Sequence, residues 1–226
     1  MSIKKKITIT IDGPAGSGKS STAKRVAEAL DYVFLDSGAM YRAVTWSVLQ
    51  NGADPFNETA SKRAAENADI HFERDETGQR VFLNGQDITE AIRTPEVTNN
   101  IAPVAANPAV RSVLAQKQKE IGAHGGIVAE GRDMGTVVFK DAELKIYMVA
   151  SIKERARRRQ KELHAKNIAV NFDDLVQEIE QRDKSDSNRQ HGALKQAEDA
   201  VLLDTSTLTL DEQTDFIVKI ARERGA

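Results

Sequence analysis

Cysteine is absent from the 226-residue sequence, which excludes disulfide bonds, thiolate catalysis and cysteine-bound metals. The four histidines lack the spacing of a metal site, and we expect them at the surface or in loops. No apolar run is long enough to cross a membrane. A net charge of −2 argues against a general nucleic-acid coat. We expect a cytoplasmic monomer with no membrane association and no stable nucleic-acid partner.

The chain begins with a basic segment, Met1–Lys6, followed by apolar residues that alternate with threonine. That alternation is unlike the continuous apolar core of a signal peptide, so we expect no secretion. The length allows one or two domains and a sizeable core.

The most informative segment is Gly13–Ser20, which reads Gly-Pro-Ala-Gly-Ser-Gly-Lys-Ser and fits the pattern G-x-x-x-x-G-K-[ST]. In such a loop, backbone N–H groups face phosphate oxygens, the lysine reaches the β- and γ-phosphates, and the hydroxyl binds Mg²⁺. A β-branched strand, Ile7–Ile11, precedes the loop and a helical pattern follows it, which places the loop at a helix N-terminus. An ordinary strand-turn-helix corner is the alternative, but it does not require Lys19 and Ser20 at this spacing.

The remaining sequence alternates short apolar strands with helical stretches, a pattern typical of a parallel sheet in an α/β protein. The expected strands are Ile7–Ile11, Tyr32–Leu35, Gly126–Ala129, Lys145–Val149 and Val201–Leu203. The expected helices lie near Arg42–Gln50, Pro108–Ile121, Ile152–Ala165, Asp173–Arg182 and Asp211–Arg222. One region differs: Ile70–Phe72, a polar turn at Asp75–Gly78, Val81–Leu83 and then Asn84-Gly85 are hairpin signals. The sequence therefore predicts a small antiparallel insert.

Arginines lie where a parallel sheet binds ligands, after the carboxyl ends of strands. Arg132 follows one expected strand, and Arg155 and Arg159 lie four residues apart on the helix after another, hence on one helix face. Phosphoryl transfer between two nucleotides needs several cations to hold donor and acceptor in line. Two alternatives remain open at this point. The arginines at 155–159 could form a solvated helix face, and Ser37 could simply cap the helix that follows it.

Several separated motifs resemble those of bacterial cytidylate kinases, over nearly the whole chain. They are Ile11–Ser20, Leu35–Arg42, Ile92–Thr94, Gly131–Phe139, Ser151–Ala156 and Arg182–Arg189. The resemblance implies transfer of the γ-phosphoryl group of ATP to CMP or dCMP, with Mg²⁺, on a P-loop nucleotide-kinase fold. That fold has a five-stranded parallel sheet flanked by helices, a small antiparallel insert in the acceptor domain and a helical lid. The implied domains are a core (1–36, 104–150 and 190–226), a CMP-binding domain (37–103) and a lid (151–189).

The resemblance also implies a role for each matching residue. The ATP phosphates would be held by Gly13, Pro14, Ala15, Gly16, Ser17, Gly18, Lys19, Ser20 and Ser21, with Ser20 also the metal ligand. CMP would be bound by Ser37, Tyr41, Arg42, Arg111, Arg132, Asp133, Asp186 and Arg189. The catalytic cations would be Lys19, Arg132, Arg155, Arg159 and Arg182. Asp133 with Arg111 would read the cytosine edge, because uracil would leave mismatched donors and acceptors there.

The sequence departs from the family at Ala102, where a serine often lies near the nucleoside; this bears on the preference for CMP over dCMP. Asp12 and Asp36, at strand ends, are weaker candidates to hold water on Mg²⁺. Two other functions remain. One is a P-loop kinase for another small acceptor such as UMP or shikimate, which would not need Arg111 with Asp133. The other is a nonenzymatic RNA-binding module that uses the basic lid helix.

Overall fold

The computed structural model describes residues 6–75, 78–165 and 167–226. The first five residues of the basic segment Met1–Lys6 and the middle of the expected hairpin turn, Glu76 and Thr77, lie outside the described residues. Backbone contacts divide the chain into two compact units, Met1–Phe34 with Gly122–Ala226, and Leu35–Ile121.

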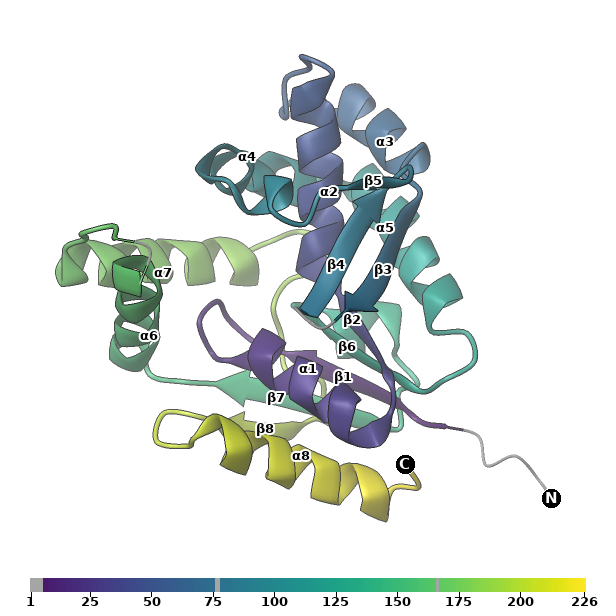
Figure 1. Ribbon diagram of the computed structural model, residues 1–226, viewed down its shortest axis with the longest axis vertical. Coiled ribbons are helices and arrows are strands. Elements are labelled where there is room, and N and C mark those ends of the chain that lie inside the picture. Colours follow the sequence, from purple (N-terminus) through teal and green to yellow (C-terminus); the bar gives the residue numbers. More distant parts are fainter. Residues whose placement is uncertain (1–5, 76–77, 166) are drawn as a thin grey trace. The chain divides into compact units, whose positions relative to one another are not determined.

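The first unit is built on a five-stranded sheet (Figure 1). Its strands are β1 (Thr8–Asp12), β2 (Val33–Asp36), β6 (Ile127–Gly131), β7 (Leu144–Val149) and β8 (Val201–Asp204), in the order β2-β6-β1-β7-β8. β1 pairs in parallel with both β6 and β7, and β7 pairs in parallel with β8. The predicted parallel sheet is therefore confirmed, and its central strand leads directly into the glycine-rich loop.

Apolar spacing explains how two helices cover this sheet. In α1 (Lys19–Leu30), Ala23, Val26 and Ala27 are buried, and in α8 (Leu210–Glu223) Ile217, Val218 and Ala221 are buried. These residues form one apolar cluster with β1, β6, β7 and β8 side chains. A capping box formed by Thr209 and Glu212 fixes the start of α8.

The other helices of this unit are η2 (Met134–Val138), which has π-helical hydrogen bonding, α6 (Ile152–Ala165) and α7 (Phe172–Ser187). α6 and α7 pack against each other through Ala156, Leu175 and Ile179, and they form the helical pair visible in Figure 1. Asn171 caps the N-terminus of α7 by accepting bonds from the N–H groups of Asp173 and Asp174. Within the described residues, we find no helix whose length and apolar character suffice to span a membrane.

The second unit combines helices with a small antiparallel sheet. Its helices are α2 (Ser37–Gln50), α3 (Glu58–Glu66), η1 (Ala91–Arg93), α4 (Pro95–Ala106) and α5 (Pro108–Ile121). The sheet has the order β3 (Ile70–Asp75), β4 (Gly78–Leu83), β5 (Gln86–Asp87), with antiparallel pairing throughout. Asn84 and Gly85 join β4 to β5 with φ values of 50° and 80°. Positive φ at both positions is typical of a tight hairpin turn, so the predicted antiparallel insert is confirmed.

Candidate functional site

Gly13–Gly18 joins β1 to α1, and Lys19 and Ser20 are the first two residues of α1, as the motif predicts. Gly16 and Gly18 have φ values of 76° and 94°, which side chains disfavour. A Cβ at Gly13 would lie 2.2 Å from the carbonyl oxygen of Met148, so glycine is required by the close approach of β7. The amino group of Lys19 is buried and donates to the carbonyl of Pro14 at 3.2 Å. The loop therefore has the strained, compact backbone that a phosphate-binding turn needs.

Glu130, at the end of β6, lies beside the side chains of Lys19 and Ser20. The Ser20 hydroxyl donates to one carboxylate oxygen of Glu130 at 2.9 Å, and the Lys19 ammonium lies 3.8 Å from the other. Glu130 is buried. It was absent from the sequence prediction, although it lies at the carboxyl end of a strand immediately before the predicted Arg132 loop, which is the signal that could have found it.

Arg155, near the start of α6, donates hydrogen bonds to the loop. Its guanidinium donates to the carbonyls of Ala15 and Ala150, each at 3.1 Å, and forms a two-bond ion pair with Asp183 of α7 at 3.0 and 2.5 Å. Arg155 is buried. It is therefore part of the loop's surroundings, and the alternative of a merely solvated helix face is wrong for this residue.

Arg158 is a further contact to the loop that the sequence prediction missed. It donates to the carbonyl of Ser17 at 3.2 Å and to the hydroxyl and carbonyl of Thr205 at 3.2 and 2.5 Å. Arg159, which was predicted, instead lies half-exposed and paired with Glu162 at 3.3 Å. Residues three apart lie on one helix face, as residues four apart do. The reasoning that led from Arg155 to Arg159 could therefore also have led to Arg158.

Asp186, on the last turn of α7, joins two of the predicted substrate arginines. One of its oxygens accepts from Arg132 at 2.6 Å and the other from Arg189 at 2.5 Å. Burial opposes ionisation of Asp186, but the charges of Arg132 and Arg189, with a contribution from Arg182, hold its pKa below the usual range. The structure thus brings three of the predicted arginines, Arg132, Arg182 and Arg189, around the carboxylate of the predicted Asp186.

The second unit positions its own set of predicted residues. Arg42 donates to the hydroxyl of Thr98 at 2.9 Å and to the carbonyl of Ile92 at 3.2 Å. The guanidinium of Arg111, which donates to the carbonyl of Ala105, lies 5.5 Å from the ring centre of Tyr41. Thr98 was not predicted; only a contact of this kind identifies it.

Ser37 is the buried first residue of α2, but it does not cap that helix. The capping group is the carboxylate of Asp36, which accepts from the N–H of Ala39 at 2.9 Å. The alternative in which Ser37 serves as a cap is therefore wrong, and a role for its hydroxyl in binding stays a prediction. Asp133 is buried at the N-cap of η2, directly after the strand β6 and its loop.

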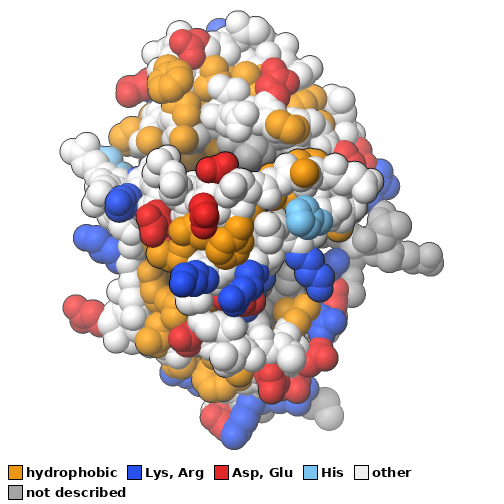
Figure 2. All heavy atoms as spheres, turned by 90° about the vertical axis from the view of Figure 1, so that its left-hand side faces the viewer, with side chains coloured by type: hydrophobic (Ala, Val, Ile, Leu, Met, Phe, Trp, Pro, Cys, Tyr) orange, Lys and Arg blue, Asp and Glu red, His pale blue; other side chains and the backbone are white. Residues whose placement is uncertain are grey.

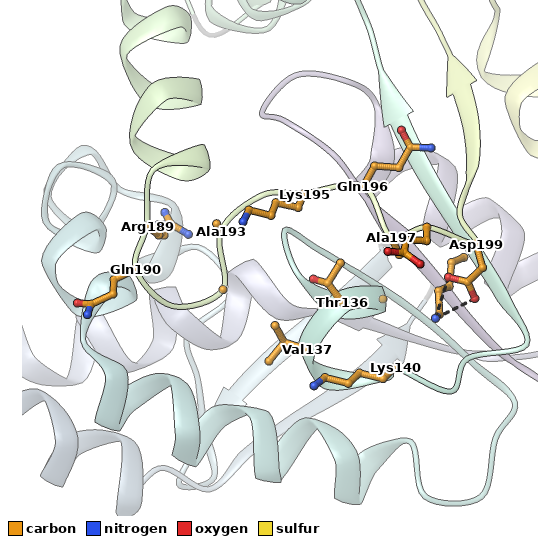
Figure 3. A pocket seen from close by; sticks show the side chains of 14 residues that line it. Thr136, Val137, Lys140, Arg189, Gln190, Ala193, Lys195, Gln196, Ala197 and Asp199 are labelled. Carbon is orange, nitrogen blue, oxygen red and sulfur yellow. Dashed lines mark hydrogen bonds and ion pairs between the residues drawn. The ribbon is translucent and has the colours of Figure 1, made fainter.

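A cavity of about 550 Å³ lies beside η2 in the first unit (Figure 3). Thr136 and Val137 of η2, Lys140, Lys195 and Arg189 line it among others, and their side chains surround its open centre in Figure 3. One of the residues that line the cavity, Arg189, was predicted to bind nucleotide. Because Arg189 also bonds to Asp186, the cavity adjoins the cluster around that carboxylate rather than the phosphate loop.

Charge on the side of the molecule that carries α6 and α7 is mixed (Figure 2). Basic side chains there have acidic neighbours: Arg157 and Arg158 pair with Glu154, Arg159 with Glu162, and Arg155 with Asp183. A helix whose arginines are each paired with a carboxylate lacks the unbroken basic surface that binds nucleic acid non-specifically. This observation disfavours an RNA-binding module.

Comparisons with known proteins give one consistent family. A family model described as cytidylate kinase matches residues 9–223. A cytidylate kinase from Anoxybacillus flavithermus is 49% identical over 98% of this chain and 99% of its own length. A cytidylate kinase from Bacillus cereus is 48% identical over 96% of each chain.

Solved structures show the same fold at low sequence identity. An uncharacterized protein from Eubacterium ventriosum has a TM-score of 0.53 at 15% identity, covering 97% of this chain and 99% of the other. A putative kinase from Chloroflexus aurantiacus has a TM-score of 0.50 at 12% identity, covering 98% and 100%. Because the family model covers residues 9–223 and the relatives match nearly the full length of both chains, this chain belongs to the cytidylate kinase family.

Proposed function

We propose that this protein transfers the γ-phosphoryl group of ATP to CMP or dCMP, giving ADP and CDP or dCDP. The observation that carries the proposal is the 48–49% identity with cytidylate kinases over nearly the full length of both chains. A match of that extent includes the phosphate loop, the lid and the acceptor segments together. The predicted division into a core, a CMP-binding domain (37–103) and a lid (151–189) is part of the proposal.

The donor phosphates would be bound by the loop from Gly13 to Ser21. Its backbone N–H groups lie at the N-terminus of α1, whose dipole favours an anion, and Lys19 adds a positive charge beside the β- and γ-phosphates. We propose that Lys19 then exchanges its bond to Pro14 for bonds to phosphate oxygens. Its burial keeps that charge poorly hydrated, and hence effective.

The oxygen atoms of Ser20 and Glu130 suit Mg²⁺, which takes one or two protein oxygens and keeps several waters. Among the described residues no group of three or more His, Cys, Asp or Glu side chains could hold a metal, so a site rich in protein ligands is not available there. We propose that Ser20 binds the ion and that Glu130 accepts from one of its waters. Bound there, Mg²⁺ would offset the negative charge of the phosphate groups.

The acceptor would be recognised by the residues that match the family's motifs. We propose that Arg42 and Arg132 bind the CMP phosphate, with Ser37 and Tyr41 beside it. Asp133 and Arg111 would read the cytosine amine, N3 and O2. Asp186 and Arg189 would bind the sugar, and Arg182 would act there or at the phosphates.

Transfer itself needs no protein nucleophile, because a phosphate oxygen of CMP attacks the γ-phosphorus of ATP directly and ADP leaves. The arginines Arg132, Arg155, Arg159 and Arg182, with Lys19, would hold the two phosphate chains in line and offset their charge. Closure of the lid would exclude water, which otherwise competes as acceptor. Because Arg155 already contacts the phosphate loop, closure requires little of it beyond release from Asp183.

A coupled assay of ADP release tests this function. With ATP and Mg²⁺ we expect turnover with CMP and dCMP and little with UMP, AMP or shikimate. Turnover with UMP or shikimate alone would support the alternative acceptor class, and absence of turnover with CMP and dCMP would refute the proposal. The same assay gives the ratio of CMP to dCMP, on which Ala102 bears. We further propose a cytoplasmic location, which the lack of cysteine supports. We also propose a monomer, which light scattering of the purified protein tests.

A further inference from the structure

Asp12 is a buried carboxylate that the proposed chemistry does not use. It is the last residue of β1, directly before Gly13, and it pairs across the sheet with Gly131 on one side and Tyr147 on the other. Its side chain is 4% exposed. A carboxylate in the centre of a sheet is costly unless its oxygens accept hydrogen bonds.

Both oxygens of Asp12 accept backbone N–H groups from η2. One accepts from Met134 at 2.8 Å and the other from Gly135 at 2.8 Å. These are the first two N–H groups of η2, which its own turns leave without partners. A carboxylate so engaged has its lone pairs directed at the backbone, which argues against Asp12 as a holder of water on Mg²⁺.

Asp133 is the residue that would ordinarily make such bonds. It occupies the N-cap of η2, a position where an aspartate usually accepts from the second or third N–H of its own helix. Asp133 makes no such capping bond, and its backbone has φ −145° and ψ 24°. Asp12, on strand β1, thus caps η2 in place of Asp133. The carboxylate of Asp133 is not required for capping.

The packing beside Asp12 is equally close. Thr10 lies two residues earlier, on the same face of β1. A Cβ at Gly135 would lie 2.9 Å from the Thr10 hydroxyl and 3.2 Å from the Lys145 side chain. The start of η2 therefore packs closely against β1, and a shift of a few tenths of an ångström would change these contacts.

We infer that Asp12 is a positioning residue that holds the Asp133 segment at the fixed place from which it reads the acceptor base. The inference rests on the proposed function, in which Asp133 contacts cytosine. Asp12 then links the two halves of the reaction: its backbone continues into the donor loop, and its side chain fixes the acceptor-reading segment. The charges of Lys19 and Asp133 affect the protonation of Asp12, and the charge of Asp12 affects that of Tyr147.

The test compares Asp12→Asn with Thr10→Val. The asparagine keeps the size of the side chain but has one oxygen to accept two N–H groups, and its amide N–H₂ faces the other. Thr10→Val removes, from the same strand face, a buried hydroxyl that bonds to none of the described residues. It is therefore a matched control for a polar change at this packing surface.

We expect Asp12→Asn to lower kcat/KM for CMP about 10- to 100-fold, the effect of losing a bond to a buried charged acceptor. The ratio of CMP to UMP activity should fall with it. The KM for ATP and the Mg²⁺ concentration for half-maximal activity should change less than about threefold, and Thr10→Val should behave as wild type.

Two results would overturn the inference. If Asp12→Asn raised the KM for ATP or the Mg²⁺ requirement as much as it harmed CMP use, Asp12 would act on the donor loop or the metal. If a folded variant, judged by circular dichroism, kept the wild-type ratio of CMP to UMP, Asp12 would only support the fold. Failure of the proposed function is distinguishable, because wild type itself would then lack activity with CMP.

Discussion

The ion pair of Arg155 with Asp183 gives a sharp test of how α6 and α7 are held together without nucleotide. Both members come from the α6–α7 pair, and the arginine is buried while the carboxylate is a quarter exposed. Asp183→Asn keeps one oxygen and removes the charge. Losing one member of a buried pair costs about 3–5 kcal/mol when nothing else satisfies the other.

Here Arg155 retains two backbone acceptors, Ala15 and Ala150, so the cost should be smaller. We expect a loss of about 1.5–3 kcal/mol, which is the range for hydrogen bonds to charged groups. For a chain of this size that corresponds to a fall in Tm of about 4–10 °C. Thermal unfolding followed by circular dichroism measures it directly.

Nucleotide should reduce the difference between the variants. If Arg155 binds a phosphate oxygen, that oxygen takes the place of the Asp183 carboxylate in both proteins. The stability that the variant lacks relative to wild type is then smaller. With saturating CMP and the non-transferable ATP analogue AMP-PNP, we expect the gap in Tm to shrink to less than half. Glu178→Gln is the control, because it makes the same charge change on α7 at an exposed residue for which no ion pair occurs among the residues described.

A gap below about 1 °C without nucleotide would show that the Arg155–Asp183 pair contributes little. A gap that nucleotide leaves unchanged would refute the exchange of carboxylate for phosphate, while leaving the ion pair itself intact.

Three other measurements test the site. Lys19→Ala should lower kcat roughly 10²- to 10³-fold or more, since one charge beside the transferring group is lost, whereas Lys24→Ala on the same helix should not; near-normal activity of the first variant would contradict its assigned role. Glu130→Gln should raise the Mg²⁺ concentration for half-maximal activity about tenfold with ATP affinity little changed, and an unaltered Mg²⁺ titration would exclude Glu130 from the metal site. Burial raises the pKa of Asp12 to about 7, so the folded state takes up a proton between pH 4 and 7 that the unfolded state does not. Its contribution to stability is therefore most favourable at low pH and declines as pH rises to 7. The unfolding free energy of wild type relative to Asp12→Asn should fall by on the order of a few kcal/mol between pH 5 and 8, and a constant difference in urea denaturation would contradict the shift.

The sequence predicted those features that depend on local pattern. The parallel sheet, the phosphate loop and the antiparallel insert follow from strand periodicity, from glycines at fixed spacing and from Asn84-Gly85, each of which acts over a few residues. The buried Arg155 was found because it lies just after a strand end. The expected boundaries of β6 and β7 differ from the observed ones by at most two residues, which is common for short strands.

Contacts between distant segments could not be predicted in the same way. Glu130 meets Ser20 across 110 residues, and Asp12 meets Met134 across 122, so neither pairing has a local signature. Arg158 and Arg159 are indistinguishable by composition. Helix phase and the position of Thr205 decide which of them turns inward, and the tertiary packing sets both.

The partners of the phosphate loop lie far along the chain from it. The carbonyl of Ser17 accepts from Arg158 and from the hydroxyl of Thr205, which is 188 residues later, and Thr22 donates to Gln213. During synthesis the loop leaves the ribosome well before the groups that shape it. A nascent chain should therefore be unable to hold ATP until the segment with Thr205 and Gln213 has been synthesised, so nucleotide binding would report the presence of that segment rather than of the loop alone.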